Sequence, residues 1–145
     1  MTTIAYREGM LAADTATFIH DGATRMPDRT KKIFRLSDGS LIAGSGIKRQ
    51  ISDFANWFES HASGQRPDVP EATIIRVTKS GTVTIYDGKT DERDVTDCPF
   101  YACGSGAMAA LAAMEMGARA DQAVEIAMKI DPWTGGEVQI ERIDM

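Results

Sequence analysis

The strand-like segments of this chain occur in hairpins, and the helix-like segments lie between these hairpins in blocks. β-Branched and apolar residues predict hairpins at residues 2–14, 32–46 and 72–88, each with a turn that contains glycine. Helical periodicity replaces this pattern over residues 47–62 and 107–131. Because strands do not alternate one by one with helices, this order favours antiparallel sheets covered by helices on the outside.

The segments that connect these elements are polar or rich in helix breakers. Residues 15–31 contain Pro27 and are predicted to be an irregular loop, and residues 63–71 form a breaker-rich connection. A short buried strand is expected before the glycine turn at residues 104–106, and a last alternating strand is expected over residues 137–143. The predicted order is therefore strands, helix, strands, two helices and a final strand.

Length and composition narrow the class of protein. The chain has 145 residues, and we expect one domain over residues 1–145. Its net charge of −5 argues against a nucleic-acid partner. No apolar stretch reaches the length of a membrane span and no secretory signal precedes the first strand, so we expect a cytoplasmic protein. Cys98 and Cys103 form neither a C-x-x-C nor a zinc motif and are expected to be reduced and buried, and no cofactor is expected.

The first residue with a candidate chemical role is Thr2. Initiator methionine is normally removed when a small residue follows it, and loss of Met1 would make Thr2 the amino terminus. An N-terminal threonine carries a hydroxyl nucleophile and an α-amine whose pKa is about 7.7–8.0, so the amine can act as the base. Taken alone, Thr2 is better explained as a small residue at the start of a strand.

A lysine and a carboxylate are candidates for tuning this hydroxyl. Lys32 directly precedes an apolar strand that can lie beside the first one, and a buried ammonium there would stabilise a developing alkoxide. Such a lysine needs a carboxylate partner because an unpaired buried charge is costly, and Asp14 at the end of the second strand is the best-placed candidate. The alternatives are a solvated basic turn at Lys31 and Lys32 and a loop-capping role for Asp14.

Two further segments combine polar residues with glycines. Ser105 lies between two glycines at the start of a helix, where free backbone N–H groups can bind an anion. This segment lacks the lysine and the spacing of nucleotide-binding loops, so a tight turn at the start of the helix explains it better. Residues 130–136 end a helix with Asp131 and then supply Thr134 and two glycines, for which a helix stop followed by a turn is the alternative.

Six segments occur in the order found in the proteasome β-type family of N-terminal-nucleophile hydrolases, which includes HslV. They are MTTI at the chain start, AAD at the end of the second strand, KKIFRL, LIAGSG, ACGSGA and DPWTGG. With these motifs, most of the chain resembles that family. The resemblance implies an α+β fold in the form of a four-layer αββα sandwich and the activity of an N-terminal threonine peptidase.

The resemblance also implies roles for the matching residues. Thr2 matches the nucleophile, and Asp14 and Lys32 match the pair that tunes it. Gly44 matches the residue whose N–H forms the oxyanion hole, and with Ser45 and Gly46 it belongs to the segment expected to bind substrate. This segment, LIAGSG, would also offer a strand edge against which an extended peptide pairs.

The motifs near the end of the chain complete the implied site. Ser105 matches a serine near the terminal amine, and Asp131 and Thr134 match an acid and a hydroxyl that orient it. Relatives can also bind a cation through carbonyl groups of this last loop, which in this chain would be those of Met128, Asp131 and Thr134. No other metal is expected.

The chain departs from the family in two places. Its first hairpin is shorter, and residues 63–71 stand where relatives carry a second helix. We therefore expect a shortened sandwich that lacks one helix. Because that helix normally contributes to ring contacts, the sequence leaves the size of the oligomer open.

The resemblance further implies substrates and partners. We expect peptides or unfolded proteins to be cleaved through an acyl-enzyme on Thr2 within a homo-oligomer, with an AAA+ unfoldase as a further partner and with neither nucleic acid nor membrane. Two other hypotheses stay open. One is an N-terminal-nucleophile amidase that acts on a small amide in a closed pocket, and the other is a non-catalytic assembly protein that keeps the fold.

Overall fold

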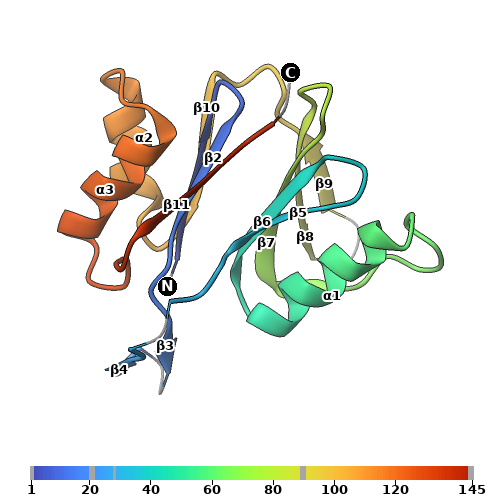
Figure 1. Cartoon of the computed structure of the whole chain (residues 1–145), viewed down its shortest axis with the longest axis horizontal. Coiled ribbons are helices and arrows are strands. Elements are labelled where there is room, and N and C mark those ends of the chain that lie inside the picture. The colour runs from blue at the N-terminus through green and yellow to red at the C-terminus, as the bar shows by residue number, and fades with distance from the viewer. Residues whose placement is uncertain (1, 20–21, 28, 89–90, 144–145) are drawn as a thin grey trace.

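The computed structural model describes residues 2–19, 22–27, 29–88 and 91–143. These residues form two antiparallel sheets, a two-stranded ribbon and three helices (Figure 1). In the first sheet the strand order is β10 (Phe100–Gly104), β1 (Thr3–Arg7), β2 (Met10–Asp14) and β11 (Val138–Arg142). In the second sheet it is β5 (Ile33–Arg35), β6 (Leu41–Gly46), β7 (Val69–Val77), β8 (Val83–Gly88) and β9 (Asp91–Asp94).

The two sheets face each other across an apolar core. Successive side chains of a strand point to opposite faces of its sheet, so alternate residues of each strand enter this core. Ile4, Leu11 and Ala13 come from the first sheet, and they cluster with residues of the second sheet, including Ile33, Leu41, Ala43, Ile75, Val77, Val83 and Ile85. The alternation predicted for the hairpins therefore decides which residues lie between the sheets.

Helices cover the outer faces of both sheets (Figure 1). α2 (Ala107–Glu115) and α3 (Ala120–Ile130) pack on the first sheet, where alanines such as Ala5 and Ala12 let Met114 and Val124 approach closely. α1 (Lys48–Glu59) packs on the second sheet and buries Phe54. The layer order is thus helices, sheet, sheet, helix. Within the described ranges, no helix has both the length and the apolar character needed to cross a bilayer.

The α+β class predicted from the sequence is confirmed by this arrangement. The second sheet carries α1 alone, because residues 60–68, which lead from α1 to β7, contain no helix. Glycine and proline in this connection interrupt helical hydrogen bonding, as the breaker-rich sequence indicated.

Two short strand pairings differ from the predictions. β3 (Phe18–Ile19) pairs with β4 (Thr24–Arg25) inside the segment predicted to be irregular, and β9 pairs with β8 although no strand was expected there. All four residues of β9 are exposed, so this edge strand has no apolar alternation that could reveal it.

The two cysteines lie in different environments. Both are free, and Cys103 is buried while Cys98 is exposed. The expectation that both would be buried is therefore wrong for Cys98, which lies in the turn before β10. Burial raises the pKa of the Cys103 thiol to about 11, so this residue behaves as a small apolar core residue.

Candidate active site

The glycine turn after β10 fixes the position of Thr2. Thr2 directly precedes β1, and only 9% of its surface is exposed. A Cβ atom at Gly104 would lie 1.7 Å from the Thr2 carbonyl oxygen, and a Cβ at Gly106 would lie 2.2 Å from Thr3 Oγ1. Gly104 also has a φ of +98°, which favours glycine. Close approach of the chain start therefore explains both glycines of the GSG segment.

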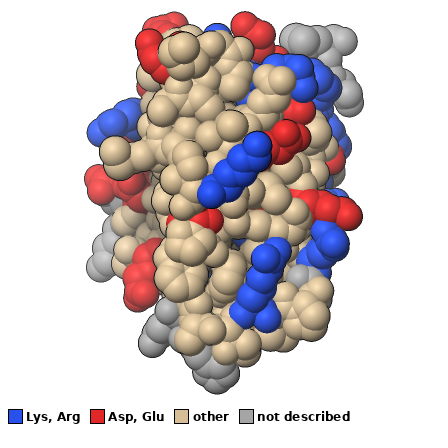
Figure 2. All heavy atoms as spheres, turned by 90° about the vertical axis from the view of Figure 1, so that its left-hand side faces the viewer, with Lys and Arg blue, Asp and Glu red and all other residues tan. Residues whose placement is uncertain are grey.

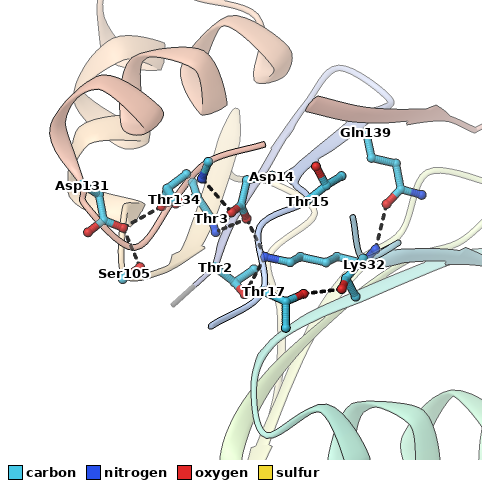
Figure 3. Close-up of polar contacts among 12 residues, drawn as sticks. Thr2, Thr3, Asp14, Thr15, Thr17, Lys32, Ser105, Asp131, Thr134 and Gln139 are labelled. Carbon is cyan, nitrogen blue, oxygen red and sulfur yellow. Dashed lines mark hydrogen bonds and ion pairs between the residues drawn. The ribbon is translucent and has the colours of Figure 1, made fainter. Parts of the chain in front are cut away.

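The side chains of Thr2, Lys32 and Asp14 converge beside this turn (Figure 3). Lys32 Nζ lies 3.1 Å from Thr2 Oγ1 and 2.9 Å from Asp14 Oδ1. Burial lowers the pKa of Lys32, while attraction to the Asp14 carboxylate and the hydrogen bond with it act in the opposite direction. The arrangement places a buried ammonium group in contact with the Thr2 hydroxyl and a carboxylate behind it.

Asp14 connects three parts of the chain. Its carboxylate is fully buried, and beside Lys32 it accepts hydrogen bonds from Thr3 N at 3.0 Å and from Gly135 N at 3.1 Å. These donors come from the start of β1 and from the loop before β11. Because both oxygens of the carboxylate accept hydrogen bonds, the charge of Asp14 can remain buried at tolerable cost.

A second network lies on the other side of the chain start. Asp131 Oδ2 accepts hydrogen bonds from Ser105 Oγ and Thr134 Oγ1, both at 2.6 Å, and Thr134 Oγ1 lies 2.7 Å from Thr3 Oγ1 (Figure 3). Since the single hydroxyl proton of Thr134 is directed to Asp131, Thr3 must be the donor to Thr134. Burial acts to raise the pKa of Asp131, while hydrogen bonds from Ser105, from Thr134 and from the backbone at Trp133 act to lower it, and on balance the pKa is lowered.

Residues 44–46 of β6, which the sequence predicts to bind substrate, lie on two different faces of the strand. Gly44 and Gly46 line a pocket of about 400 Å³ together with Thr2 and Lys32. Ser45 is buried, does not line this pocket and lies on the opposite face of the strand. The close packing of α1 requires glycine at position 44, because a Cβ there would lie 2.8 Å from a side-chain atom of Ile51.

The register of β6 sets the direction of the Gly44 N–H. Ile47 N donates to Glu71 O at 3.0 Å, next to the paired strands β6 and β7. N–H groups of an antiparallel strand alternate between its two sides, so Ser45 N–H faces β7 and Gly44 N–H faces the side of Lys32. Pairing of β5 with β6 ends at Ile33 and Ala43, so within the described residues β6 extends beyond its neighbour.

Several polar residues at the site had no predicted role. Thr3 takes part in both networks, and Thr17 and Thr30, joined through their hydroxyls, line the pocket. Gln139 of β11 bonds to the backbone at Lys32, and its alternating sequence context gave no sign of this contact. These roles depend on how the two sheets are placed together, which local sequence patterns do not encode.

The structure also bears on the residues that could hold a metal. Among the described residues, no group of three or more histidine, cysteine, aspartate or glutamate side chains is arranged to bind a metal ion. The cation site implied at the carbonyl groups of Met128, Asp131 and Thr134 is a different kind of site and stays a prediction. Met1 and His20 lie outside the described residues.

Comparisons with known proteins place the fold. No protein-family model and no curated protein matches the sequence. Among solved structures, Thiobacillus denitrificans BPH in complex with epoxomicin superposes with a TM-score of 0.70 at 20% identity, covering 99% of each chain. BPH from the same organism gives a TM-score of 0.67 at 20% identity over 99% of this chain and 98% of the other. Eukaryotic HslV from Trypanosoma brucei gives 0.67 at 18% identity over 97% and 98%. With the layer order and the strand topology described above, this chain has the fold of the proteasome β-type, HslV-like family.

Proposed function

We propose that this protein is an N-terminal threonine peptidase that hydrolyses peptide bonds through an acyl-enzyme on Thr2, after Met1 has been removed. The observation that carries the proposal is the contact of 3.1 Å between Thr2 Oγ1 and the buried ammonium group of Lys32. A threonine that merely begins a strand has no need for a buried cation at its hydroxyl, because burial of that cation is costly.

The first step uses the amine and the hydroxyl of the same residue. The neutral α-amine of Thr2 accepts the hydroxyl proton, directly or through a water molecule, and Oγ1 attacks the carbonyl carbon of the scissile peptide bond. The positive charge of Lys32 favours the developing alkoxide, and Asp14 compensates that charge in the resting protein. Ser105, Asp131 and Thr134 lie on the other side of the chain start, where they orient the amine.

The second step depends on stabilisation of the oxyanion. The N–H of Gly44, which faces the side of Lys32, donates to the carbonyl oxygen as it becomes negative. The carbon–nitrogen bond then breaks, and the leaving amine takes the proton from the Thr2 ammonium. Water attacks the resulting ester, its proton passes to the Thr2 amine, and the carboxylic acid product leaves with Thr2 restored.

Two features favour peptides over a small amide as substrates. The pocket beside Thr2 is lined mainly by apolar groups such as Phe18, Phe34 and Ile51, which suit a substrate side chain. β6 continues past the end of β5, so the edge at Gly44–Gly46 suits an added strand of extended peptide. A closed pocket, which the amidase hypothesis requires, has no such edge.

Peptide hydrolysis by the processed protein tests this function. Mass spectrometry first establishes that Met1 is absent, and a library of fluorogenic peptides is then offered to the wild type and to Thr2→Ala. We expect hydrolysis that Thr2→Ala abolishes and that Thr24→Ala, an exposed threonine on β4, leaves unchanged. Processed protein that cleaves no peptide of the library would refute the peptidase, and cleavage of small amides alone would favour the amidase.

Epoxomicin gives a second test of the same site. It is bound by the BPH structure that shares this fold. We expect epoxomicin to add covalently to the processed wild type and to stop peptide hydrolysis, whereas Thr2→Ala should gain no mass. Adduct formation in Thr2→Ala would place the reactive group elsewhere.

We further infer that copies of this chain associate. The face formed by α2 and α3 shows broad uncharged areas between its charged side chains (Figure 2). Large apolar side chains exposed there are Met108, Leu111, Met116, Ile126 and Ile130. Exposed apolar surface of this kind is typical of protein–protein contacts. Light scattering should report an oligomer that Met108→Glu weakens, and a monomer in the wild type would contradict the inference. An AAA+ unfoldase partner stays a prediction.

A further inference from the structure

We propose that Gln139 is a positioning residue of the active site, which holds the backbone at Lys32 so that its ammonium group reaches Thr2. This inference rests on the function proposed above. Gln139 lies on β11, in the first sheet, whereas Lys32 directly precedes β5 of the second sheet. The Gln139 side chain therefore bridges the two sheets at the backbone of Lys32.

The amide group of Gln139 uses both of its polar atoms on the backbone of Lys32 and Ile33, and Figure 3 shows the contact of its oxygen at Lys32. Its Oε1 accepts hydrogen bonds from Lys32 N at 2.8 Å and from Ile33 N at 3.0 Å, and its Nε2 donates to Ile33 O at 3.0 Å. At Ile33 the amide thus acts like the peptide group of a neighbouring strand. This contact satisfies backbone groups of Ile33 on the edge of β5 that pairs with no described strand.

The backbone departs from regular strand geometry at Lys32, because the N–H groups of Lys32 and Ile33 donate to the same acceptor, Gln139 Oε1. Successive N–H groups of a regular strand point to opposite sides, so Lys32 N and Ile33 N could not reach one acceptor if β5 continued through residue 32. Leu36 N donates to Ser40 O, and this register would direct Lys32 N towards Gly44 of β6. Gln139 Oε1 instead accepts the hydrogen bond from the Lys32 N–H, and the paired part of β5 begins at Ile33.

Residues of the first sheet bind both the backbone and the ammonium group of Lys32. In the register of β11 and β2, Gln139 lies opposite Ala13 and Val138 lies opposite Asp14. Asp14 therefore binds the ammonium group while a residue of the adjacent strand binds the backbone of the same lysine. Because the amide is uncharged, Gln139 fixes the lysine without adding a charge that would compete with Asp14 or Thr2.

The test compares Gln139→Leu with a matched variant, Glu141→Gln. Leucine has a similar size but neither donor nor acceptor, and Glu141 lies two residues along the same strand, where it pairs with Arg35 and not with the backbone of Lys32. With peptide substrates we expect Gln139→Leu to lower kcat about 10-fold or more with little change in KM, because the loss affects transition-state stabilisation. Glu141→Gln should keep kcat within about 2-fold of the wild type.

A second readout does not require activity. Side-chain NMR titration of Lys32 should show that its pKa, lowered by burial in the wild type, moves towards the ordinary lysine value in Gln139→Leu and not in Glu141→Gln. Unchanged kcat and an unchanged Lys32 pKa in Gln139→Leu would overturn the proposal. If the wild type hydrolyses no peptide, the proposed function fails, but the titration still decides the role of Gln139.

A conservative variant guards against misfolding. Gln139→Asn keeps an uncharged amide, but its side chain is one methylene shorter and cannot hold all three contacts to Lys32 N, Ile33 N and Ile33 O. We expect its kcat and its Lys32 pKa to lie between those of the wild type and Gln139→Leu. If Gln139→Leu does not fold, Gln139→Asn with wild-type values of both quantities would overturn the proposal.

Discussion

The two carboxylates beside the chain start have opposite environments. Asp14 is fully buried and binds a charged partner, Lys32, together with two backbone N–H groups. Asp131 is partly exposed, and its side-chain contacts are the hydroxyl groups of Ser105 and Thr134. One acid therefore holds a buried cation, and the other holds a chain of neutral donors.

This difference separates two tasks at one site. A buried ion pair is tolerated only when both charges remain, because removal of one partner leaves the other charge uncompensated. A partly exposed acid can lose a hydroxyl partner to water at small cost. A substitution at Asp14 should therefore lower both the stability of the fold and the rate of hydrolysis. A substitution at Asp131 should affect the rate of hydrolysis more than the stability.

The largest expected effect is the loss of stability in Asp14→Asn. This variant leaves Lys32 buried without its counter-charge, and we expect the free energy of unfolding to fall by about 3 kcal/mol or more. Asp131→Asn should cost less than about 1.5 kcal/mol. Urea unfolding of both variants measures the difference, and equal losses would show that the two acids do not divide these tasks.

Gly104→Ala should have the next largest effect. The new Cβ would meet the Thr2 carbonyl oxygen, and the positive φ adds strain, so we expect a loss of about 2 kcal/mol or more together with loss of activity. Gly117→Ala is the matched control, because Gly117 has a φ of +101° but a Cβ added there would meet no described atom within 4 Å. It should lose only the strain energy, about 1 kcal/mol. Similar losses in the two variants would contradict the close approach of Thr2.

Lowering the pH should reveal the contribution of Asp131 to the stability of the fold. Its folded pKa is lowered from 3.8, so the unfolded chain binds more protons and the stabilisation present above about pH 4 is lost as the pH falls through the folded pKa. Thermal unfolding between pH 5 and pH 2 should show a steeper loss of stability in the wild type than in Asp131→Asn. Parallel curves would mean that Asp131 does not gain stabilisation from its hydroxyl partners.

The smallest expected effect on stability belongs to Ser105→Ala. Ser105 is exposed, so water can replace its hydroxyl at Asp131, and we expect a loss below about 1 kcal/mol. The pKa of Asp131 should rise because one of the hydrogen bonds that lowers it is removed. NMR titration of Asp131 checks this, and an unchanged pKa would exclude Ser105 as a determinant of that pKa.

Local sequence patterns were sufficient for the elements that bring the two acids near Thr2. Alternating residues predicted the β1–β2 hairpin that ends at Asp14, and the apolar residues after Lys32 predicted β5. Helical periodicity and the proline after Asp131 predicted the end of α3. In each case residues close in sequence determine the backbone, so the pattern is readable without a structure.

Contacts between distant segments could not be predicted in this way. Gln139 reaches Lys32 only because β11 and β5 meet at the edges of facing sheets, and nothing in an alternating strand marks one glutamine as a bridge. The glycines of the GSG segment were better explained as a turn at the start of a helix, and their closeness to Thr2 and Thr3 required the pairing of β1 with β10. The β3–β4 ribbon and β9 lack the buried alternation on which strand prediction depends.

The central claim is that the Thr2 hydroxyl is a nucleophile prepared by contact with Lys32. The most direct measurement is peptide mapping by mass spectrometry of the processed protein after reaction with a peptide epoxyketone, in the wild type and in Lys32→Met. We predict one adduct on Thr2 in the wild type and at least a roughly 10-fold slower reaction in Lys32→Met. An adduct on another residue, or a reaction equally fast without the lysine, would contradict this claim.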